Sequence, residues 1–330
     1  MSTISDVAKL SGLSKTTVSR VLNNHPYVSE DKKKKVLKAM KELGYSPNPA
    51  ARRLRGQLTT TIGVIVPRIV NPFFSYLVNA IEQTAFTQGY QVLICQSNED
   101  KEKELAFLNL LKTKQIDGIV MTSLENDWGI IEQYTEYGPI VLCNEYLNNP
   151  DVPIVRIDQN KGAYIGINHL IQQGHRKIAY CTGGLFDEQG KDKDRNQGFQ
   201  KALKEAGIMI NPKWIFVNQH TIEDGKRVIN QILEMDDRPT AVFTGSDEVA
   251  GGMMIKAKEH GLNIPDDIAI IGFDDQPIAE LLDPQLTTIR QPVNQMGEKA
   301  VEVIIDLLNN PEKRISSYEL PIELVIRKST

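Results

Sequence analysis

The sequence predicts an α/β protein in which a helix-turn-helix head and a short hinge helix precede a two-lobed domain of parallel sheets. Three observations support this prediction. Two short helical patterns flank a glycine turn within the first 22 residues. Residues 48–56 carry the start and stop signals of a further helix. From Thr61 onward, short apolar runs alternate with amphipathic stretches, as in parallel sheets covered on both faces by helices.

The charge of the chain is divided unevenly between its two ends. Residues 1–56 contain 12 lysines and arginines against 4 aspartates and glutamates, whereas the formal net charge of all 330 residues is −4. A basic segment on an acidic body indicates that the segment contacts phosphate and that the body has another role. The length allows two or three domains, each with its own core.

Two helices are predicted at the N-terminus. Thr3 pairs with Asp6 as a cap for the first helix, and Gly12 ends it. Ser14 then caps a second helix that runs to about Leu22. Apolar residues at helical spacing predict the inward face of the pair: Val7, Leu10, Val18, Val21 and Leu22.

The exposed face of the second helix is polar and basic. It carries Lys15, Thr16, Thr17, Ser19 and Arg20. Arginine binds guanine with two parallel hydrogen bonds, threonine offers a methyl or a hydroxyl, and lysine reaches phosphate or guanine. Because cap, turn, core and exposed face agree, DNA reading is favoured over a plain helical hairpin. The run Lys32–Lys35, between a cap at Ser29 and a stop at Gly44, is more typical of a solvated face or a backbone contact.

A hinge helix of about two turns is predicted next. Asn48 suits the N-cap, Pro49 the first helical position and Gly56 the stop. Helices shorter than about 12 residues are marginal in water, so this one is expected to form only with a partner helix and DNA. Leu54 lies among arginines, as an apolar wedge for the minor groove would. The alternative is a flexible linker with an incidental leucine.

The segments TISDVAKLSGLSKTTVSRVLN and YSPNPAARRLRG resemble the head and hinge of LacI/GalR-family repressors, and the resemblance continues along essentially the whole chain. It implies that the second helix enters the major groove, with Lys15, Thr16 and Arg20 reading bases. It also implies that the hinge helices of two subunits pair in the minor groove with Leu54 as the wedge. The other expected DNA contacts are Thr3, Ser5, Ser14, Thr17, Ser19, Asn23, Tyr45, Asn48, Ala51 and Arg52.

In the body, apolar runs predict strands at 62–66, 91–95, 118–121, 139–143, 177–181, 241–244 and 268–273. Helices are expected between them at 74–88, 102–114, 164–173, 197–206 and 249–260. Two lobes accommodate these strands more economically than one long sheet, and ligands bind at the carboxyl ends of such strands. The expected division is head 1–47, hinge and linker 48–60, and an effector-binding and dimerisation domain 61–330. Its first lobe spans about 61–158 and 291–317, and its second lobe about 159–290 and 318–330.

Polar and aromatic side chains follow several predicted strands. Phe73 and Phe74 can stack on a sugar ring, and Asn71 can cap the helix that they begin. Arg195 offers a planar fork for hydroxyls or a carboxylate, and Asp274 can accept two hydrogen bonds. Asp158 lies where the chain is expected to cross between lobes. A charged residue after a strand is more often a helix cap or a solvated loop residue, but together these side chains suggest a polar pocket.

This half resembles periplasmic sugar-binding proteins and the effector domains of the same repressors. The resemblance implies a periplasmic-binding-protein-like fold, ligand contacts by Phe73, Arg195 and Asp274, and a carbohydrate-type effector such as a sugar or sugar phosphate. Ser246 and Asp247 stand where sugar-binding relatives often have Asn then Asp, so an altered contact is expected there. The charged loop 187–194 is expected to reshape the pocket.

The C-terminal part predicts two further crossings between the lobes. The stretch 286–292, followed by a helix at 296–308, is expected to return to the first lobe, and 317–326 is expected to be a final strand that crosses back. No leucine heptads follow, which favours a homodimer over a coiled-coil tetramer.

Motifs for other chemistry are missing from the sequence. No HExxH, GxSxG or Cys/His cluster is present, so no catalytic residue, metal or cofactor is expected. The stretch from Gly184 to Lys191 has the wrong spacing for a phosphate loop, and Asp192 follows where Ser or Thr would hold magnesium. An α/β enzyme such as a sugar kinase or dehydrogenase is therefore not supported. The N-terminus shows no signal segment, which favours a cytoplasmic protein over a transport-type sugar-binding protein.

One alternative stays open within this interpretation. The stretches 24–28 and 137–143 resemble catabolite-control regulators of low-GC Gram-positive bacteria. That resemblance implies a serine-phosphorylated phosphocarrier protein as corepressor on the first lobe, with Arg68 as a candidate contact. The main expectation is a repressor that binds a near-palindromic, double-stranded operator and responds to a small molecule.

Overall fold

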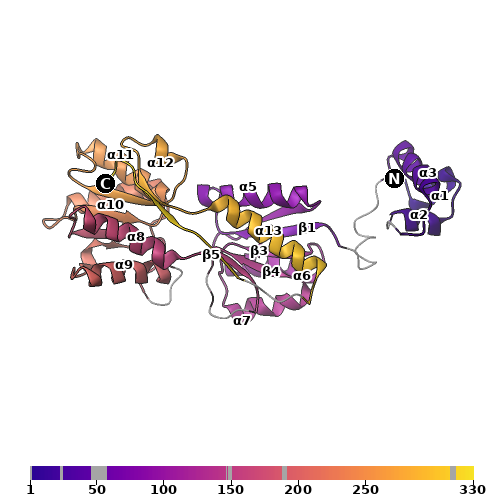
Figure 1. Cartoon of the computed structure of the whole chain (residues 1–330), viewed down its shortest axis with the longest axis horizontal. Coiled ribbons are helices and arrows are strands. Elements are labelled where there is room, and N and C mark those ends of the chain that lie inside the picture. Colours follow the sequence, from indigo (N-terminus) through magenta and orange to yellow (C-terminus); the bar gives the residue numbers. More distant parts are fainter. Residues whose placement is uncertain are drawn as a thin grey trace.

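The computed structural model describes residues 2–22, 25–45, 58–145, 147, 151–187, 192–312 and 317–330. Figure 1 shows a three-helix head and two α/β lobes that lie next to each other. The predicted hinge helix lies outside the described residues, and so do Asn23, Asn48, Ala51, Arg52 and Leu54.

The head contains α1 (Ile4–Ser11), α2 (Lys15–Leu22) and α3 (Glu30–Leu43). The predicted capping box is confirmed, because the Thr3 side chain accepts from the Asp6 N–H and the Asp6 carboxylate accepts from the Thr3 N–H. The Ser14 hydroxyl accepts from the Thr17 N–H at 3.1 Å, as expected of a cap. These caps satisfy helix-end N–H groups that would otherwise lack partners.

One predicted core residue of the head is wrong. Val7, Val18 and Val21 are buried as expected, but Leu10 is 49% exposed. The inward face of α1 instead follows Ile4, Val7 and Ala8, which lie three and four residues apart, and Leu10 falls outside that stripe. Ser29 stands at the N-cap of α3, but its side chain makes no capping hydrogen bond.

The first lobe is a parallel six-stranded sheet in the order β11-β5-β4-β3-β1-β2. Its strands are β1 (Thr61–Val66), β2 (Gln91–Gln96), β3 (Gly118–Met121), β4 (Ile140–Cys143), β5 (Ile154–Ile157) and β11 (Tyr318–Leu320). Its helices are α5 (Pro72–Thr87), α6 (Lys101–Lys112), α7 (Trp128–Ile131), the 3-10 helix η1 (Glu132–Tyr137) and α13 (Val293–Asn309). Ile62, Val64 and Val66 pack with residues of α5 and α13, whereas Ile65 packs with α6, so helices cover both faces.

The second lobe has the order β12-β10-β9-β8-β6-β7, with only β12 antiparallel to its neighbour in the described chain. Its strands are β6 (Ile178–Cys181), β7 (Ile215–Phe216), β8 (Ala241–Thr244), β9 (Ala269–Asp274), β10 (Thr287–Arg290) and β12 (Glu323–Val325). Its helices are α8 (Gln159–Gln172), α9 (Lys193–Glu205), η2 (Pro212–Trp214), α10 (Ile222–Leu233), α11 (Asp247–Glu259) and α12 (Ile278–Leu281). None of the helices in the described residues is long and apolar enough to cross a membrane.

The chain passes between the lobes three times. It crosses from β5 into α8, from β10 into α13, and from β11 into β12. The single strand expected at 317–326 is therefore wrong, because β11 belongs to the first sheet and β12 to the second. Pro321 separates them and has no N–H with which to continue a ladder. Residues 318–320 accordingly lie in the first lobe, not in the second as expected.

Helices α10 and α11 approach each other at two glycines. A Cβ atom at Gly225 would lie 2.1 Å from the main-chain oxygen of Val249, and one at Gly252 would lie 2.0 Å from that of Ile222. Only glycine permits main chains to come this close. The contact orients α11, whose first turn reaches the region between the lobes.

Candidate functional site

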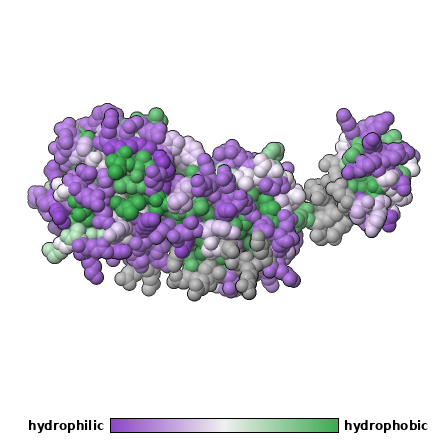
Figure 2. All heavy atoms as spheres, viewed as in Figure 1, coloured by the Kyte–Doolittle hydropathy of each residue, from purple (hydrophilic) through white to green (hydrophobic). Residues whose placement is uncertain are grey.

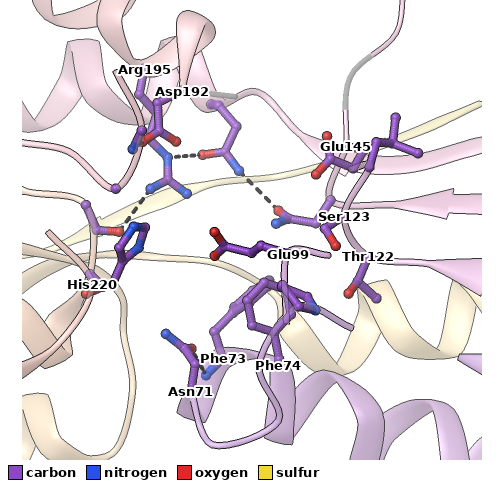
Figure 3. A pocket seen from close by; sticks show the side chains of 18 of the residues that line it. Asn71, Phe73, Phe74, Glu99, Thr122, Ser123, Glu145, Asp192, Arg195 and His220 are labelled. Carbon is purple, nitrogen blue, oxygen red and sulfur yellow. Dashed lines mark hydrogen bonds between the residues drawn. The ribbon is translucent and has the colours of Figure 1, made fainter. Parts of the chain in front are cut away.

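A cavity of about 680 Å³ lies between the lobes (Figure 3). It forms where the carboxyl ends of the strands in both sheets meet, which is the usual place for ligands in open α/β sheets. The loops after β1, β2, β3 and β4 line it from the first lobe, and those after β6, β7, β8 and β9 line it from the second. In the described residues, no group of three potential ligands is arranged to hold a metal ion.

Arg195 is held in the cavity wall by three contacts. Its Nε donates to Oε1 of Gln159 at 2.6 Å, and its Nη1 donates to the main-chain oxygen of Gly245 at 2.9 Å. The guanidinium carbon lies 4.0 Å from the centre of the Phe273 ring, a cation–π distance. Gln159 in turn donates from Nε2 to Oδ1 of Asn144 at 3.1 Å. This chain of side chains joins the loop after β4 in the first lobe to α9 in the second.

Two carboxylates of the second lobe line the cavity, and their pKa values are shifted in opposite directions. Oδ2 of Asp192 accepts from the Thr182 hydroxyl and from the Gly184 N–H. Burial opposes its charge, but Arg195 and these two donors outweigh burial and lower the pKa of Asp192. Burial raises the pKa of Asp274 to about 6, with Arg195 and the amides of Gln276 and Gln291 opposing the rise.

Aromatic side chains form the floor of the cavity on the first lobe. Phe73 and Phe74 begin α5 and contact each other edge to face, with ring centres 5.2 Å apart. Oδ1 of Asn71 accepts from the Phe73 N–H at 3.0 Å, so Asn71 caps α5 as predicted. Figure 3 shows both rings beneath Glu99, with Arg195 and His220 on the opposite lobe.

Six of the eight residues expected to bind the effector line this cavity: Asn71, Phe73, Phe74, Arg195, Ser246 and Asp274. Asp158 does not line it, because its carboxylate caps α8 by accepting from the Lys161 N–H at 2.8 Å. Asp247 is fully buried behind the wall and accepts from the Gln276 N–H at 2.6 Å and the Thr288 hydroxyl at 2.5 Å. Burial, together with the charge of Asp274, raises the pKa of Asp247.

Several cavity residues were not predicted, notably Glu99, Gln159, His220 and Gln291. Glu99 follows β2, so the rule that pointed to Asp274 could have found it. His220 follows β7, a strand of two residues that leaves no sequence pattern. Arg68 was considered only as a candidate contact for a phosphocarrier protein. It lines the cavity, where its Nη2 donates to the main-chain oxygen of His220 at 3.2 Å.

The head presents the side chains predicted to read DNA. Lys15, Thr16 and Arg20 are exposed on α2, whereas Val18 and Val21 of the same helix are buried. Thr17 and Ser19 are half-buried, and the Thr17 hydroxyl lies 2.9 Å from that of Ser14. Thr3 and Ser14 are exposed, Ser5 is half-buried, and Tyr45 packs against the head's core. The basic face of α2 is thus free to enter a groove.

Two protein-family models match the chain. Residues 3–48 match the bacterial regulatory proteins of the lacI family. Residues 59–328 match the periplasmic binding proteins and sugar binding domain of the LacI family. The second match alone covers more than half of the chain.

Curated relatives match over their full lengths. The NTD biosynthesis operon regulator NtdR of Bacillus subtilis is 44% identical over 100% of both chains. Catabolite control protein A of Priestia megaterium is 35% identical over 99% of both chains.

Solved structures show the same architecture. A LacI family transcriptional regulator from Lactobacillus casei with bound sucrose superposes with a TM-score of 0.77 at 32% identity, over 82% of this chain and 99% of that one. The Lac repressor dimer bound to operator and the anti-inducer ONPF superposes with a TM-score of 0.86 at 27% identity, over 99% of this chain and 98% of that one. The family consists of DNA-binding regulators and not of enzymes. The chain belongs to the LacI family of bacterial regulatory proteins, and it is an effector-controlled, DNA-binding transcriptional regulator.

Proposed function

We propose that the protein is a homodimeric repressor whose affinity for a pseudo-palindromic operator is set by a small carbohydrate-type effector bound between the lobes. The observation that carries this proposal is the cavity in which Arg195 and Asp274 of the second lobe lie opposite Phe73 and Phe74 of the first. Guanidinium donors and carboxylate acceptors suit sugar hydroxyls, and aromatic rings suit the apolar face of a sugar ring. The sucrose-bound relative supports the same class of ligand.

In this proposal the effector contacts Asn71, Phe73, Phe74, Arg195, Ser246 and Asp274. Asp158 and Asp247 act indirectly, by fixing the start of α8 and the loop after β9. Arg195 is hydrogen-bonded to Gln159, which is hydrogen-bonded to Asn144. A displacement of Arg195 by the ligand therefore changes the contact between the two lobes.

The head and hinge are the proposed DNA-binding parts, with residues 1–47 as the head and 48–60 as the hinge and linker. On α2, Lys15, Thr16 and Arg20 contact base edges in the major groove. Thr3, Ser5, Ser14, Thr17, Ser19 and Asn23 contact the backbone or groove walls, while Tyr45, Asn48, Ala51 and Arg52 support the minor-groove contact of Leu54. The exposure of the basic face of α2 over a buried apolar core supports this assignment.

A homodimer is supported by apolar surface on the body of the protein. Leu281 of α12 is 83% exposed and Ile255 of α11 is 42% exposed, and Figure 2 shows hydrophobic surface in that region of the second lobe. In the first lobe, Phe86 of α5 is 72% exposed, and Leu93 and Ile94 of β2 are 41% and 48% exposed. Paired patches of this kind suit a two-fold interface. The relative bound to operator is also a dimer.

Effector and operator are coupled through the position of the lobes. A change in the tilt of one lobe against the other alters the separation of the two hinges in a dimer. Since the hinge helix is too short to be stable alone, a coupling free energy of about 1–3 kcal/mol suffices to switch operator binding.

Operator selection from random DNA tests this function. The full-length protein is expected to enrich a two-fold symmetric site with a flexible pyrimidine–purine step at its centre. Repeating the selection with neutral sugars and sugar phosphates is expected to identify a ligand that shifts the affinity. Enrichment of no sequence, or binding that falls equally for selected and random DNA as salt rises, contradicts the proposal.

A second candidate is a phosphorylated phosphocarrier protein as corepressor. The observation that favours it is 35% identity to catabolite control protein A over 99% of both chains. Arg68, the candidate contact, lines the cavity and donates to the main-chain oxygen of His220. Operator affinity measured with the phosphorylated and the unphosphorylated phosphocarrier protein would separate the two candidates. Only the second candidate function predicts that the two forms change operator affinity differently.

A further inference from the structure

The cavity carries more negative than positive side chains. Among the described lining residues, six are acidic: Glu99, Asp127, Glu145, Asp192, Asp194 and Asp274. Three are basic: Arg68, Lys193 and Arg195. This imbalance indicates which charge a ligand of the cavity brings, because carboxylates gathered around one cavity repel one another.

The hydrogen bonds that the two arginines form with described residues go to groups other than these carboxylates. Arg68 donates to the main-chain oxygen of His220, and Arg195 donates to Gln159 and to the main-chain oxygen of Gly245. Neither forms an ion pair in the described part of the chain. Both cations are therefore used to hold the cavity walls, and their hydrogen bonds go to neutral oxygens.

Glu99 extends its carboxylate into the cavity from the first lobe. It follows β2, and it and Asn98 have left-handed backbone conformations, with φ of 60° and 54°. The Glu99 N–H donates to the Ser97 hydroxyl at 3.3 Å, which fixes this turn. Figure 3 shows the Glu99 side chain in the middle of the cavity, above the Phe73 and Phe74 rings. Its carboxylate has no hydrogen bond or ion pair with any described residue.

Asp192 supplies a second carboxylate from the opposite lobe. Its two hydrogen bonds from described residues both reach Oδ2. The charge of Arg195 and the two donors keep the pKa of Asp192 low in spite of burial, so the group is anionic at neutral pH. A Cβ atom at Gly184 would lie 3.5 Å from Oδ2, which shows how closely the loop after β6 surrounds this carboxylate.

We propose that the effector is a polyhydroxylated molecule that carries at least one protonated amine, which Glu99 of the first lobe and Asp192 of the second lobe recognise. The proposal rests on the proposed function and narrows its ligand class. A hydrogen bond from an ammonium group to a carboxylate is about twice as strong as one between neutral groups. A neutral sugar leaves the repulsion between the carboxylates in place, and a sugar phosphate adds to it.

The position of the two carboxylates links ligand charge to lobe movement. Closing the lobes brings Glu99 and Asp192 toward each other, which is unfavourable while the space between them holds no cation. An ammonium group between them reverses the sign of this interaction. A cationic polyol therefore favours the closed arrangement more strongly than its neutral counterpart does.

Isothermal titration calorimetry on the full-length protein, in a buffer without amines or phosphate, tests the proposal. The probes are glucose, its 2-, 3- and 6-amino-deoxy derivatives, N-acetylglucosamine and glucose 6-phosphate. At least one amine is expected to bind at least tenfold more tightly than glucose and N-acetylglucosamine, and glucose 6-phosphate is expected to bind most weakly. If no amine binds more tightly than glucose, whether both bind or neither does, the proposal is overturned.

Two variants separate charge recognition from general damage to the cavity. Glu99→Gln keeps the shape of the side chain and is expected to reduce the preference for the amine over glucose at least tenfold. Glu102→Gln, on the exposed first turn of α6, is the matched control and is expected to leave the preference for the amine over glucose unchanged. An unaltered preference in Glu99→Gln also overturns the proposal. A neutral sugar or a sugar phosphate that binds best and shifts operator affinity would overturn this inference but leave the proposed function intact.

Discussion

Arg68 of the first lobe donates a hydrogen bond from Nη2 to the main-chain oxygen of His220 in the second lobe, over 3.2 Å. Both residues line the cavity, and a second hydrogen bond between the lobes joins Gln159 to Asn144. His220 is itself fixed, because its N–H donates to Asp224 Oδ2 at 2.8 Å. The lobes are thus joined by side-chain contacts as well as by three main-chain crossings.

Replacing Arg68 by methionine is expected to weaken effector binding about fivefold, which corresponds to about 1 kcal/mol for one partly exposed, charge-assisted hydrogen bond. The bond stabilises the arrangement in which the cavity is formed, so its loss lowers the population competent to bind. Calorimetric titration of the effector measures this effect.

Arg176→Met is the matched control for that variant. Arg176 Nη1 donates to the main-chain oxygen of Ala206 at 3.1 Å, within the second lobe and away from the cavity. Its loss is expected to leave effector affinity unchanged. Equal losses in both variants would mean that lobe contacts do not govern binding.

Arg20→Ala is expected to cost about 1–3 kcal/mol of operator affinity and to relax the preference at one base position. The side chain is exposed on α2, where a guanidinium can bind guanine with two hydrogen bonds. Lys38→Ala, on α3, removes the same charge from the head and is expected to lower affinity evenly across sequences, if at all. Fluorescence anisotropy on the operator and its single-base variants distinguishes base reading from a uniform loss.

Leu54→Ala is expected to lower affinity for the operator and to leave weak, non-specific binding nearly unchanged, because an apolar wedge acts only where DNA can be kinked. Competition between operator and random DNA measures the ratio. Equal losses on both kinds of DNA would rule out the wedge.

Gly252→Ala is expected to destabilise the protein by about 2 kcal/mol or more, because its Cβ would lie 2.0 Å from the main-chain oxygen of Ile222. Gly251→Ala, one residue earlier in α11, meets only side-chain atoms at 3.5 Å or more. Alanine is favoured over glycine in a helix by up to about 1 kcal/mol, so this control is expected to be neutral or slightly stabilising. Denaturant unfolding of both variants checks the difference.

The stability of the protein is expected to depend on the charge of Asp274. Burial raises the pKa of Asp274 from 3.8 to about 6, so the folded protein binds this proton more tightly than the unfolded chain does. The group therefore destabilises the fold progressively as the pH rises from about 4 through about 6. Asp274→Asn is expected to gain stability relative to the parent over that window, as measured by denaturant midpoints.

Asp283→Asn is expected to have the opposite effect on the stability of the protein. The hydrogen bond and charge of Lys258 lower the pKa of Asp283, so this carboxylate stabilises the fold at neutral pH and loses that contribution as the pH falls. The variant is expected to lose stability at neutral pH. A difference between Asp274→Asn and the parent that stays constant with pH would contradict the assignment.

The strands of the body could be predicted well from the sequence. Apolar runs of four to six residues located seven of them with ends that differ by at most one residue. Such runs are distinctive because a strand covered on both faces has no polar positions. Helix starts were less certain: α8 begins at Gln159 and not at Tyr164, because its first turn is polar and is set by the Asp158 cap.

The cavity could be predicted only where a residue's role follows from its place after a strand. That rule found Phe73 and Asp274, but it could not separate Asp274, which lines the cavity, from Asp247, which is buried behind it. The difference depends on the Thr288 hydroxyl and the Gln276 N–H, which belong to other elements. The contact of Arg68 could not be predicted for the same reason, since its partner His220 lies 152 residues away in the sequence.

The three passages of the chain between the lobes have a practical consequence for engineering. Neither lobe is encoded by one uninterrupted stretch, because the first takes β11 and α13 from the C-terminal part and the second takes β12 from beyond β11. A hybrid regulator made by a single splice near residue 158 would keep the second sheet from one parent but would place β11 and α13 of that parent in a first lobe otherwise built from the other. A clean exchange of ligand preference between relatives requires grafting every segment of a lobe at once, or changing cavity side chains one by one.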